Sequence, residues 1–117
     1  MSEEIKHSPG TKYDAGKLRL DLLDPDFMAG VAEVLGFGAE KYDEHNWTKG
    51  IHWTRLYGAI LRHLRSAMYE GMEDPESGLL HLDHAGCMLM FLRRHMVDSR
   101  YKRWDDRCEI FINEDKV

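Results

Sequence analysis

Two segments with helical periodicity, joined by a short acidic turn, do most to limit the folds open to this chain. Apolar residues recur at helical spacing over residues 53–70 and again over residues 79–96. The turn between them, MEDPESG, contains Asp74 followed by Pro75, a pair that often starts a helix. A connection this short predicts two helices that fold back on each other and bring one face of each together.

A third helix is expected nearer the N-terminus. The run DPD at residues 24–26 combines a capping carboxylate, a proline at the first helical position and a second carboxylate at the positive end of the helix dipole. The helical pattern then continues to about Tyr42 and is loosened by Gly30, Gly36 and Gly38. A glycine inside a helix costs about 1 kcal/mol relative to alanine. The last two glycines therefore indicate the close approach of a neighbouring helix or a ligand, or a weak helix end.

The segment before this helix is expected to be extended. Leucines alternate with other residues at positions 18, 20 and 22, which fits a short strand or an extended arm laid across the core, and the arm is favoured. Near the other end, CEIFI at residues 108–112 is a candidate short strand. The fold class expected is all-α: a helical bundle of three to four helices with an extended N-terminal arm. It forms a single domain over residues 1–117, in which residues 1–12 and 105–117 are peripheral.

The helices that flank the turn also predict which residues are buried. The later helix is apolar nearly all round between Ala85 and Leu92, so it is expected at the centre of the bundle or at a subunit interface. The earlier helix is expected to bury one apolar stripe, which consists of Leu56, Ile60, Leu61, Leu64 and Met68.

Composition argues against several classes of protein. A formal net charge of -5 disfavours non-specific binding to a nucleic-acid polymer, which needs a basic surface. No apolar run approaches ~18 residues, and the N-terminus lacks the apolar segment of a signal peptide, so a cytoplasmic location without membrane contact is expected. Cys87 and Cys108 form no CxxC pair, and Cys87 lies in an apolar run, which argues against a disulfide framework and against a nucleophilic thiol.

The strongest chemical signal lies around the acidic turn. Imidazole and carboxylate groups suit divalent transition metals, whereas all-oxygen sites suit Mg²⁺. His63 and Glu70 are seven residues apart and His81 and His84 are three apart, so each pair is expected to share a helix face. The ordinary alternatives are a helix cap for Asp74, solvated charges for the other carboxylates and structural roles for the histidines. The candidate metal ligands are His63, His81, His84, Asp74 and Glu76, and the candidate catalytic carboxylates are Glu70, Asp74 and Glu76.

Basic and aromatic residues suggest an anionic ligand that contains a base. The guanidinium group of arginine matches pairs of phosphate oxygens, and Arg62 adjoins the candidate metal ligands. Trp47 lies in a polar loop and offers a surface on which a base can stack, with core packing as the alternative. Further candidates for phosphate contacts are Lys17, Arg19 and Lys41.

Other catalytic schemes fit poorly. The chain has no GxSxG, no phosphate-binding glycine loop of the Walker type and no GxGxxG. The His-Asp dipeptide of another class of metal phosphohydrolases occurs only in reverse, as Asp83-His84. A metal-dependent phosphorus hydrolase remains.

Four runs of sequence resemble a family of phage and bacterial enzymes, the dATP/dGTP diphosphohydrolases of the MazZ-like type. They are KYDAGKLRLDLLDPDF, VAEVLGFGAEKYDEHNW, RLYGAILRHL and EDPESGLLHLDHAG, which together span roughly residues 12–96. The family looks like a divergent branch of the all-α, MazG-type nucleoside triphosphate pyrophosphohydrolases. The resemblance implies cleavage of dGTP or dATP to the monophosphate and pyrophosphate, with a divalent metal such as Mg²⁺ or Mn²⁺. It also implies a setting in a bacterium or a phage-infected cell.

The sequence departs from MazG-type enzymes at the metal site. Those enzymes place metals with ExxE on one helix and ExxD on the next, where this chain has His63 with Ser66 and His81 with His84. Either the site is rebuilt around the histidines, with another transition metal open to it, or the acids come from elsewhere. The fallback acids are Glu40, Asp43 and Glu44. With the resemblance, Lys17, Arg19, Lys41 and Arg62 are expected to hold phosphates, and Asn46 and Trp47 to contact base or sugar.

Two partner predictions accompany this reading. MazG-type proteins usually assemble their sites in oligomers, so a homodimer or homotetramer is expected. The alternative from another functional class is a catalytically inactive helical module that binds a nucleotide or a partner.

Overall fold

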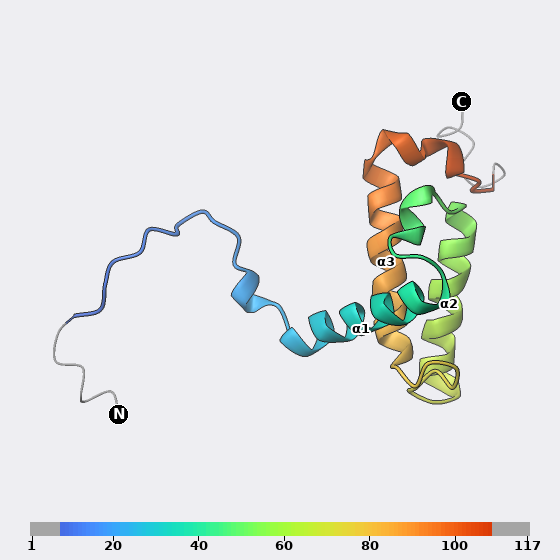
Figure 1. The fold of residues 1–117 in the computed structure, drawn as a ribbon, viewed down its shortest axis with the longest axis horizontal. Helices are drawn as coiled ribbons and strands as arrows, with labels where there is room; N and C mark the ends of the chain where they lie inside the picture. Colours follow the sequence, from blue (N-terminus) through green and yellow to red (C-terminus); the bar gives the residue numbers. More distant parts are fainter. Residues whose placement is uncertain (1–7, 109–117) are drawn as a thin grey trace.

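A computed structural model describes residues 8–108 of the chain (Figure 1). Three α-helices of 17 residues each dominate it: α1 over Pro25–Lys41, α2 over Trp53–Tyr69 and α3 over His81–Val97. Three short 3-10 helices accompany them: η2 over Leu20–Leu22, η3 over Asn46–Lys49 and η4 over Ser99–Trp104. Within the described residues the only extended pairing is an isolated bridge between Glu73 and Leu80. The all-α fold class is thus confirmed.

The bundle is organised around α3. This helix contacts α2 along its length, α1 crosses it, and η4 folds back against its end (Figure 1). Side chains from all three helices form the core, and burying each removes enough apolar surface to contribute roughly 1.5–3 kcal/mol. The buried core residues are Val34, Trp53, Leu56, Ile60, Cys87, Phe91 and Leu92.

Most helix boundaries lie where the local sequence predicts them. The carboxylate of Asp24 accepts a hydrogen bond from the backbone N–H of Asp26, which caps α1. The start of α3, at His81, is later than the pair Asp74-Pro75 predicts. Residues 72–80 form a tight loop instead, in which the N–H of Asp74 donates to the carbonyl of Leu79 at 2.8 Å and the N–H of His81 donates to the carbonyl of Met72 at 2.9 Å.

The close contact between helices that the sequence offers for Gly36 and Gly38 is found at Gly86 instead. A Cβ at Gly36 or Gly38 would meet no other atom within 4 Å, and both residues line a cavity described below. A Cβ at Gly86 of α3, by contrast, would run into the ring of Phe27. The first turn of α1 therefore rests on α3 because residue 86 has no side chain.

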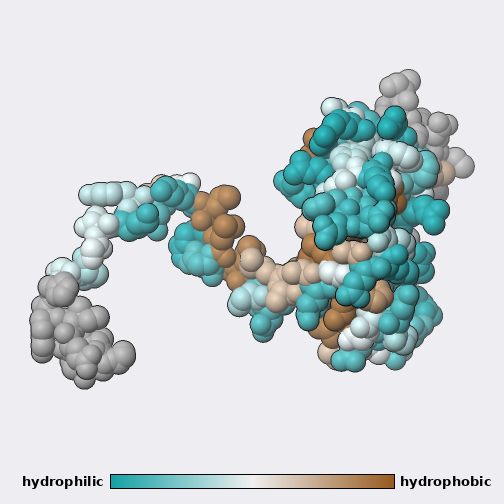
Figure 2. Space-filling view, viewed as in Figure 1, coloured by the Kyte–Doolittle hydropathy of each residue, from teal (hydrophilic) through white to brown (hydrophobic). Residues whose placement is uncertain are grey.

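The N-terminal arm does not lie across the core, which corrects that prediction. It leads away from the bundle, on the side of α3 opposite α2 (Figure 1). Leu18 and Leu22 are 84% and 73% exposed, and apolar side chains stand out along the arm in Figure 2. The alternating leucines contain the short helix η2 and lie on no core surface formed by the described residues.

The predicted buried stripe of α2 is only half right. Leu56 and Ile60 are buried, but Leu61, Leu64 and Met68 are 62%, 42% and 74% exposed. The reason is the number of layers: α1 covers one side of the α2–α3 pair, and no described segment covers the other. The central position of α3 is confirmed by its buried residues, although part of its apolar surface is exposed too.

Two other predictions concern the candidate strand near the C-terminus and the thiol of Cys87. The candidate strand at 108–112 lies outside the described residues except for Cys108, which is exposed and in no strand. Cys87 is buried, and burial raises the pKa of its thiol to about 11, so it remains protonated at neutral pH as an apolar core residue would. None of the described helices has both the length and the apolar character needed to cross a membrane.

Replacing Gly86 by alanine is expected to destabilise the fold by about 1–3 kcal/mol, because the new methyl group displaces Phe27 and the first turn of α1. The matched control is Gly36→Ala, which adds a methyl group to open space and removes the conformational freedom of a helical glycine, a gain of up to ~1 kcal/mol. Urea unfolding followed by circular dichroism measures both. Equal effects of the two substitutions would contradict the close contact between α1 and α3.

Candidate functional site

Two histidines meet where the end of α2 lies beside the start of α3. The Nδ1 atoms of His63 and His81 are 2.8 Å apart, so one proton is shared between two ring nitrogens. A carboxylate oxygen of Asp74 lies 3.9 Å from each of these nitrogens. These three side chains form a cluster, here called the His-Asp cluster, whose candidate ligand atoms lie within 4.8 Å of one another.

The two carboxylate oxygens of Asp74 have different roles. Oδ1 accepts hydrogen bonds from the backbone N–H groups of Glu76 at 2.7 Å and Ser77 at 3.3 Å, which closes a turn inside the loop. Oδ2 is the oxygen that faces His63 and His81. The predicted alternatives, a structural cap and a metal ligand, thus fall on different atoms of one side chain, although the turn that it closes is not a helix start.

His84 is held apart from the cluster. Its Nε2 lies 2.7 Å from Oγ of Ser77, and its ring stacks on that of His63, with centroids 4.6 Å apart and planes inclined by 7°. Phe37 meets the ring of His84 edge-on at 6.2 Å. The stacked ring of His84 thus holds the ring of His63 in position from one face.

Burial sets the charge of these groups. It lowers the pKa of His63 below 6.5, and the neighbouring His84 and His81 lower it further. Burial likewise lowers the pKa of His84. For Asp74 burial acts in the opposite sense, but the N–H groups of Glu76 and Ser77 outweigh it and hold its pKa below the ordinary value. At neutral pH His63 and His84 are therefore neutral imidazoles and Asp74 is an ionised carboxylate, the protonation states that bind metals.

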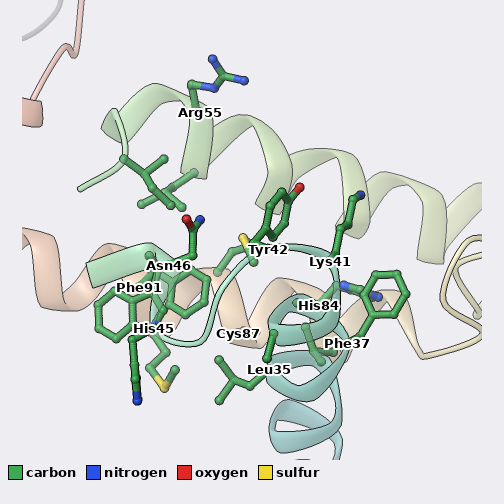
Figure 3. A pocket seen from close by; sticks show the side chains of 18 of the residues that line it. Leu35, Phe37, Lys41, Tyr42, His45, Asn46, Arg55, His84, Cys87 and Phe91 are labelled. Atoms are coloured by element: carbon green, nitrogen blue, oxygen red, sulfur yellow. The ribbon is translucent and has the colours of Figure 1, made fainter. Parts of the chain in front are cut away.

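A large cavity of about 1020 Å³ opens beside the cluster. It lies between α2, the end of α1 and the loop that follows α1, and Figure 3 shows Lys41, Tyr42 and Asn46 pointing from the latter two toward α2. At its edge Nζ of Lys41 pairs with Oε2 of Glu76 at 3.0 Å. The sequence-predicted site residues that line the cavity are Lys41, Asn46, Trp47, Arg62, His63, Asp74, Glu76 and His84.

Four predicted residues do not line this cavity, and one of them, His81, belongs to the His-Asp cluster beside it. Lys17 and Arg19 lie on the exposed arm, where Arg19 pairs with Asp21 at 2.8 Å. Glu70 follows the last residue of α2 instead of continuing the face of His63. It pairs with Arg65 at 2.8 Å, and hydrogen bonds from Ser66 and Arg65 lower its pKa. A carboxylate held in this way is stabilised as a surface ion.

The loop after α1 presents a mixture of polar and structural residues. The ring of Trp47 stacks on Phe91, with centroids 4.7 Å apart, so one face is used in core packing, as the ordinary alternative had it. Of the fallback acids, Asp43 and Glu44 line the cavity, whereas Glu40 is exposed and does not.

The sequence reasoning missed two residues that hold the site in place. Ser77 contacts both His84 and the turn of Asp74, and its place two residues after a proline in the loop gave little signal. His95, fully buried, accepts a hydrogen bond at Nε2 from the N–H of Ile51 and donates from Nδ1 to the carbonyl of Phe91. It thereby fixes the loop that carries Asn46 and Trp47. Its spacing of 14 residues from His81, on the same buried face of α3, could have indicated this.

The residues present fit a divalent metal at the His-Asp cluster. A metal–nitrogen or metal–oxygen bond of about 2.0–2.2 Å places neighbouring ligand atoms about 3.0–3.5 Å apart. The observed separations of 2.8 Å and 3.9 Å bracket that range, so small side-chain rotations suffice. The metal itself stays a prediction.

The stability of the metal-free protein is expected to fall as the pH drops through about 6.5 toward pH 5. His63 and His84 have pKa values lowered by folding, so the unfolded chain binds more protons in this range, and the stabilisation present above pH 6.5 is lost below it. Urea unfolding across this range measures the slope. His84→Gln should flatten it, because it removes one of the two imidazoles whose pKa folding lowers. Parallel slopes for His84→Gln and the unchanged protein would contradict this assignment.

Comparison with known proteins agrees with the resemblance noted in the sequence. A family model described as "dATP/dGTP diphosphohydrolase, N-terminal" matches residues 7–107. A protein of Salmonella phage PMBT28 named dATP/dGTP diphosphohydrolase is 42% identical over 98 residues, which cover 81% of this chain and 33% of the relative. The chain thus spans about a third of the length of that relative. No solved structure gives a significant match, and kinship with MazG-type enzymes stays a prediction. The family match, over most of the chain, places this protein among the dATP/dGTP diphosphohydrolase N-terminal domains.

Proposed function

We propose that this chain hydrolyses a purine deoxynucleoside triphosphate, dGTP or dATP, to the monophosphate and pyrophosphate in the cavity beside the His-Asp cluster. The observation that carries the proposal is the joint lining of one cavity by cationic side chains and by two members of that cluster, His63 and Asp74. The name of the phage relative supplies the substrate class. About 1020 Å³ is ample for one nucleotide, because ligand pockets typically measure ~300–1,000 Å³.

Positive charge along the cavity is proposed to hold the triphosphate. Arg62 lies on α2 directly before His63, and Arg55 lies two turns earlier on the same helix. Lys41 is the last residue of α1, and all three line the cavity. Guanidinium groups bind pairs of phosphate oxygens, and their charge opposes the build-up of negative charge during transfer. Asn46, from the loop fixed by His95, is proposed to contact base or sugar.

A carboxylate is proposed to take the proton of the attacking water. Glu76 is preferred among the predicted acids. Asp74 also lines the cavity but faces the two histidines, whereas the present partner of Glu76 is Lys41, a side chain that the triphosphate would recruit. The water oxygen forms a bond to the α-phosphorus, the bond from that phosphorus to the bridging oxygen breaks, and pyrophosphate leaves with the electron pair. A divalent cation bound at the His-Asp cluster would supply charge neutralisation at the phosphate oxygens.

Pyrophosphate release from dGTP and dATP, with Mg²⁺, Mn²⁺ or Co²⁺ supplied, tests the proposal. Turnover is expected, and Arg62→Gln should raise KM about tenfold or more, because a charge-assisted hydrogen bond contributes ~1.5–3 kcal/mol. The control is Arg93→Gln, which changes an exposed arginine of α3 outside the cavity. Absence of pyrophosphate from every common nucleotide would refute the proposal.

A second candidate function, a module that binds a partner, is favoured by an exposed apolar face. It consists of Leu61, Leu64 and Met68 on α2 and Leu82, Leu89 and Met96 on α3, all 42–74% exposed. At ~100° per residue these rows lie on the side of the α2–α3 pair away from the cavity. Their spacings of three, four and seven residues are those of helices that pack against other helices.

The partner that fits this face best is a second copy of the chain, in line with the predicted homodimer or homotetramer. The six side chains together expose about as much surface as three fully exposed ones. Stable interfaces bury about 1,200–2,000 Å² in total, so this face would form the apolar centre of a contact between two copies. The N-terminal arm leaves on the far side of α3 and does not compete for the face.

Leu61→Glu is expected to convert an oligomer to monomers in light scattering coupled to size exclusion, because it buries a charge in the apolar contact. Leu18→Glu is the matched control, since Leu18 is 84% exposed on the arm. A monomeric unchanged protein, or dissociation only with Leu18→Glu, would remove this face as the interface between copies.

A further inference from the structure

We propose that the His-Asp cluster binds a transition metal of the Zn²⁺ and Co²⁺ type in preference to Mg²⁺, through the Nδ1 atoms of His63 and His81 and one oxygen of Asp74. The inference concerns the metal that resides in the protein and does not require the chain to be a hydrolase. It also reduces the predicted ligand set, because His84 and Glu76 are left out.

The two histidines face each other across a single shared proton. Two ring nitrogens at 2.8 Å accommodate one proton between them, and an imidazole that is neutral carries its proton on one nitrogen only. The nitrogen lone pair that accepts this hydrogen bond lies close to Oδ2 of Asp74, and the three candidate ligand atoms are within 4.8 Å of one another. A cation between these atoms would satisfy all three groups at once, with the proton released on binding.

The chemistry of the three atoms selects the metal. Mg²⁺ prefers six oxygens and holds its waters firmly, whereas this cluster offers two nitrogens and one oxygen. The other oxygen of Asp74 is engaged by the N–H groups of Glu76 and Ser77, so this carboxylate does not approach a metal with both oxygens. Two imidazoles and a carboxylate are a usual ligand set for Zn²⁺.

The surroundings hold the ligands in position. His63 comes from α2, His81 from the first turn of α3 and Asp74 from a loop closed by the hydrogen bonds of residues 72–81. The three side chains are only 20%, 9% and 16% exposed, respectively. His63 and Asp74 line the cavity, so a metal bound here has an open side toward it, as catalytic metal sites do.

His84 acts on the site indirectly. Its Nε2 is occupied by Ser77 and its ring stacks on His63, so it is a positioning residue. A replacement at position 84 should therefore change metal affinity less than a replacement at position 63. This difference separates a three-ligand cluster from the four-residue histidine and carboxylate set that the sequence predicts.

The test is metal binding to the full chain after removal of metals with a chelator. Co²⁺ titration followed by visible absorption should show one equivalent with a spectrum typical of nitrogen ligands, and Zn²⁺ should displace it. Mg²⁺ in millimolar excess should not. Asp74→Asn and His63→Ala should weaken Co²⁺ binding about 100-fold or more. His84→Asn should weaken it about tenfold, and His52→Ala should leave it unchanged.

Three outcomes would overturn the inference: displacement of Co²⁺ by Mg²⁺, unchanged Co²⁺ binding in both Asp74→Asn and His63→Ala, or no binding to the unchanged chain. Asp74→Asn keeps the size and the hydrogen-bonding turn of the loop, so it reports on the ligand even if His63→Ala does not fold. Turnover with Mg²⁺ but no tight Co²⁺ site would leave the hydrolase standing and remove this site. Tight binding without turnover of any nucleotide would do the reverse.

Discussion

The antiparallel packing of α2 against α3 is the constraint on which the rest of the structure depends. Leu56 and Ile60 bury one face of α2 against a core that contains Cys87 and Leu92 of α3. Because the helices run in opposite directions, the last turns of α2 lie beside the first turn of α3, and His63 meets His81 across 18 residues of sequence. The intervening loop has to return within a short distance, which carries Asp74 to the same place.

The buried histidines of this bundle differ in the hydrogen-bond partners of their ring nitrogens. His95 is fully buried and both of its nitrogens have backbone partners, so its polar atoms are satisfied within the protein and its role is structural. His63 and His81 have one hydrogen bond to each other at their Nδ1 atoms, while Oδ2 of Asp74 faces both rings at 3.9 Å, too far for a hydrogen bond to either. A buried polar group without full partners costs about 1–3 kcal/mol. The second arrangement is retained at the edge of a cavity, which is where binding of a ligand can offset that cost.

Sequence reasoning succeeded where the information was local. Caps and apolar spacing predicted the bounds of α1 and α2, and the histidine and carboxylate types predicted which residues gather near the turn. It failed where the answer depends on how many layers the fold has. The periodicity that buries Ile60 equally predicts burial of Leu61 and Met68, and only the absence of a described helix on that side of the pair leaves them exposed.

The rotation of side chains within the site was also beyond the sequence. Spacing alone makes His81 and His84 equivalent, yet Nδ1 of His81 contacts His63 and Nε2 of His84 contacts Ser77. The difference arises because the loop of residues 72–80 brings the hydroxyl group of Ser77 to His84. The sequence likewise does not determine where the N-terminal arm carries Lys17 and Arg19. Their charges fit a triphosphate, but the arm that carries them extends away from the large cavity beside the His-Asp cluster. A phosphate contact from these residues therefore requires either a rearranged arm or the cavity of another subunit. In each case the free energy would come from covering the exposed leucines beside them.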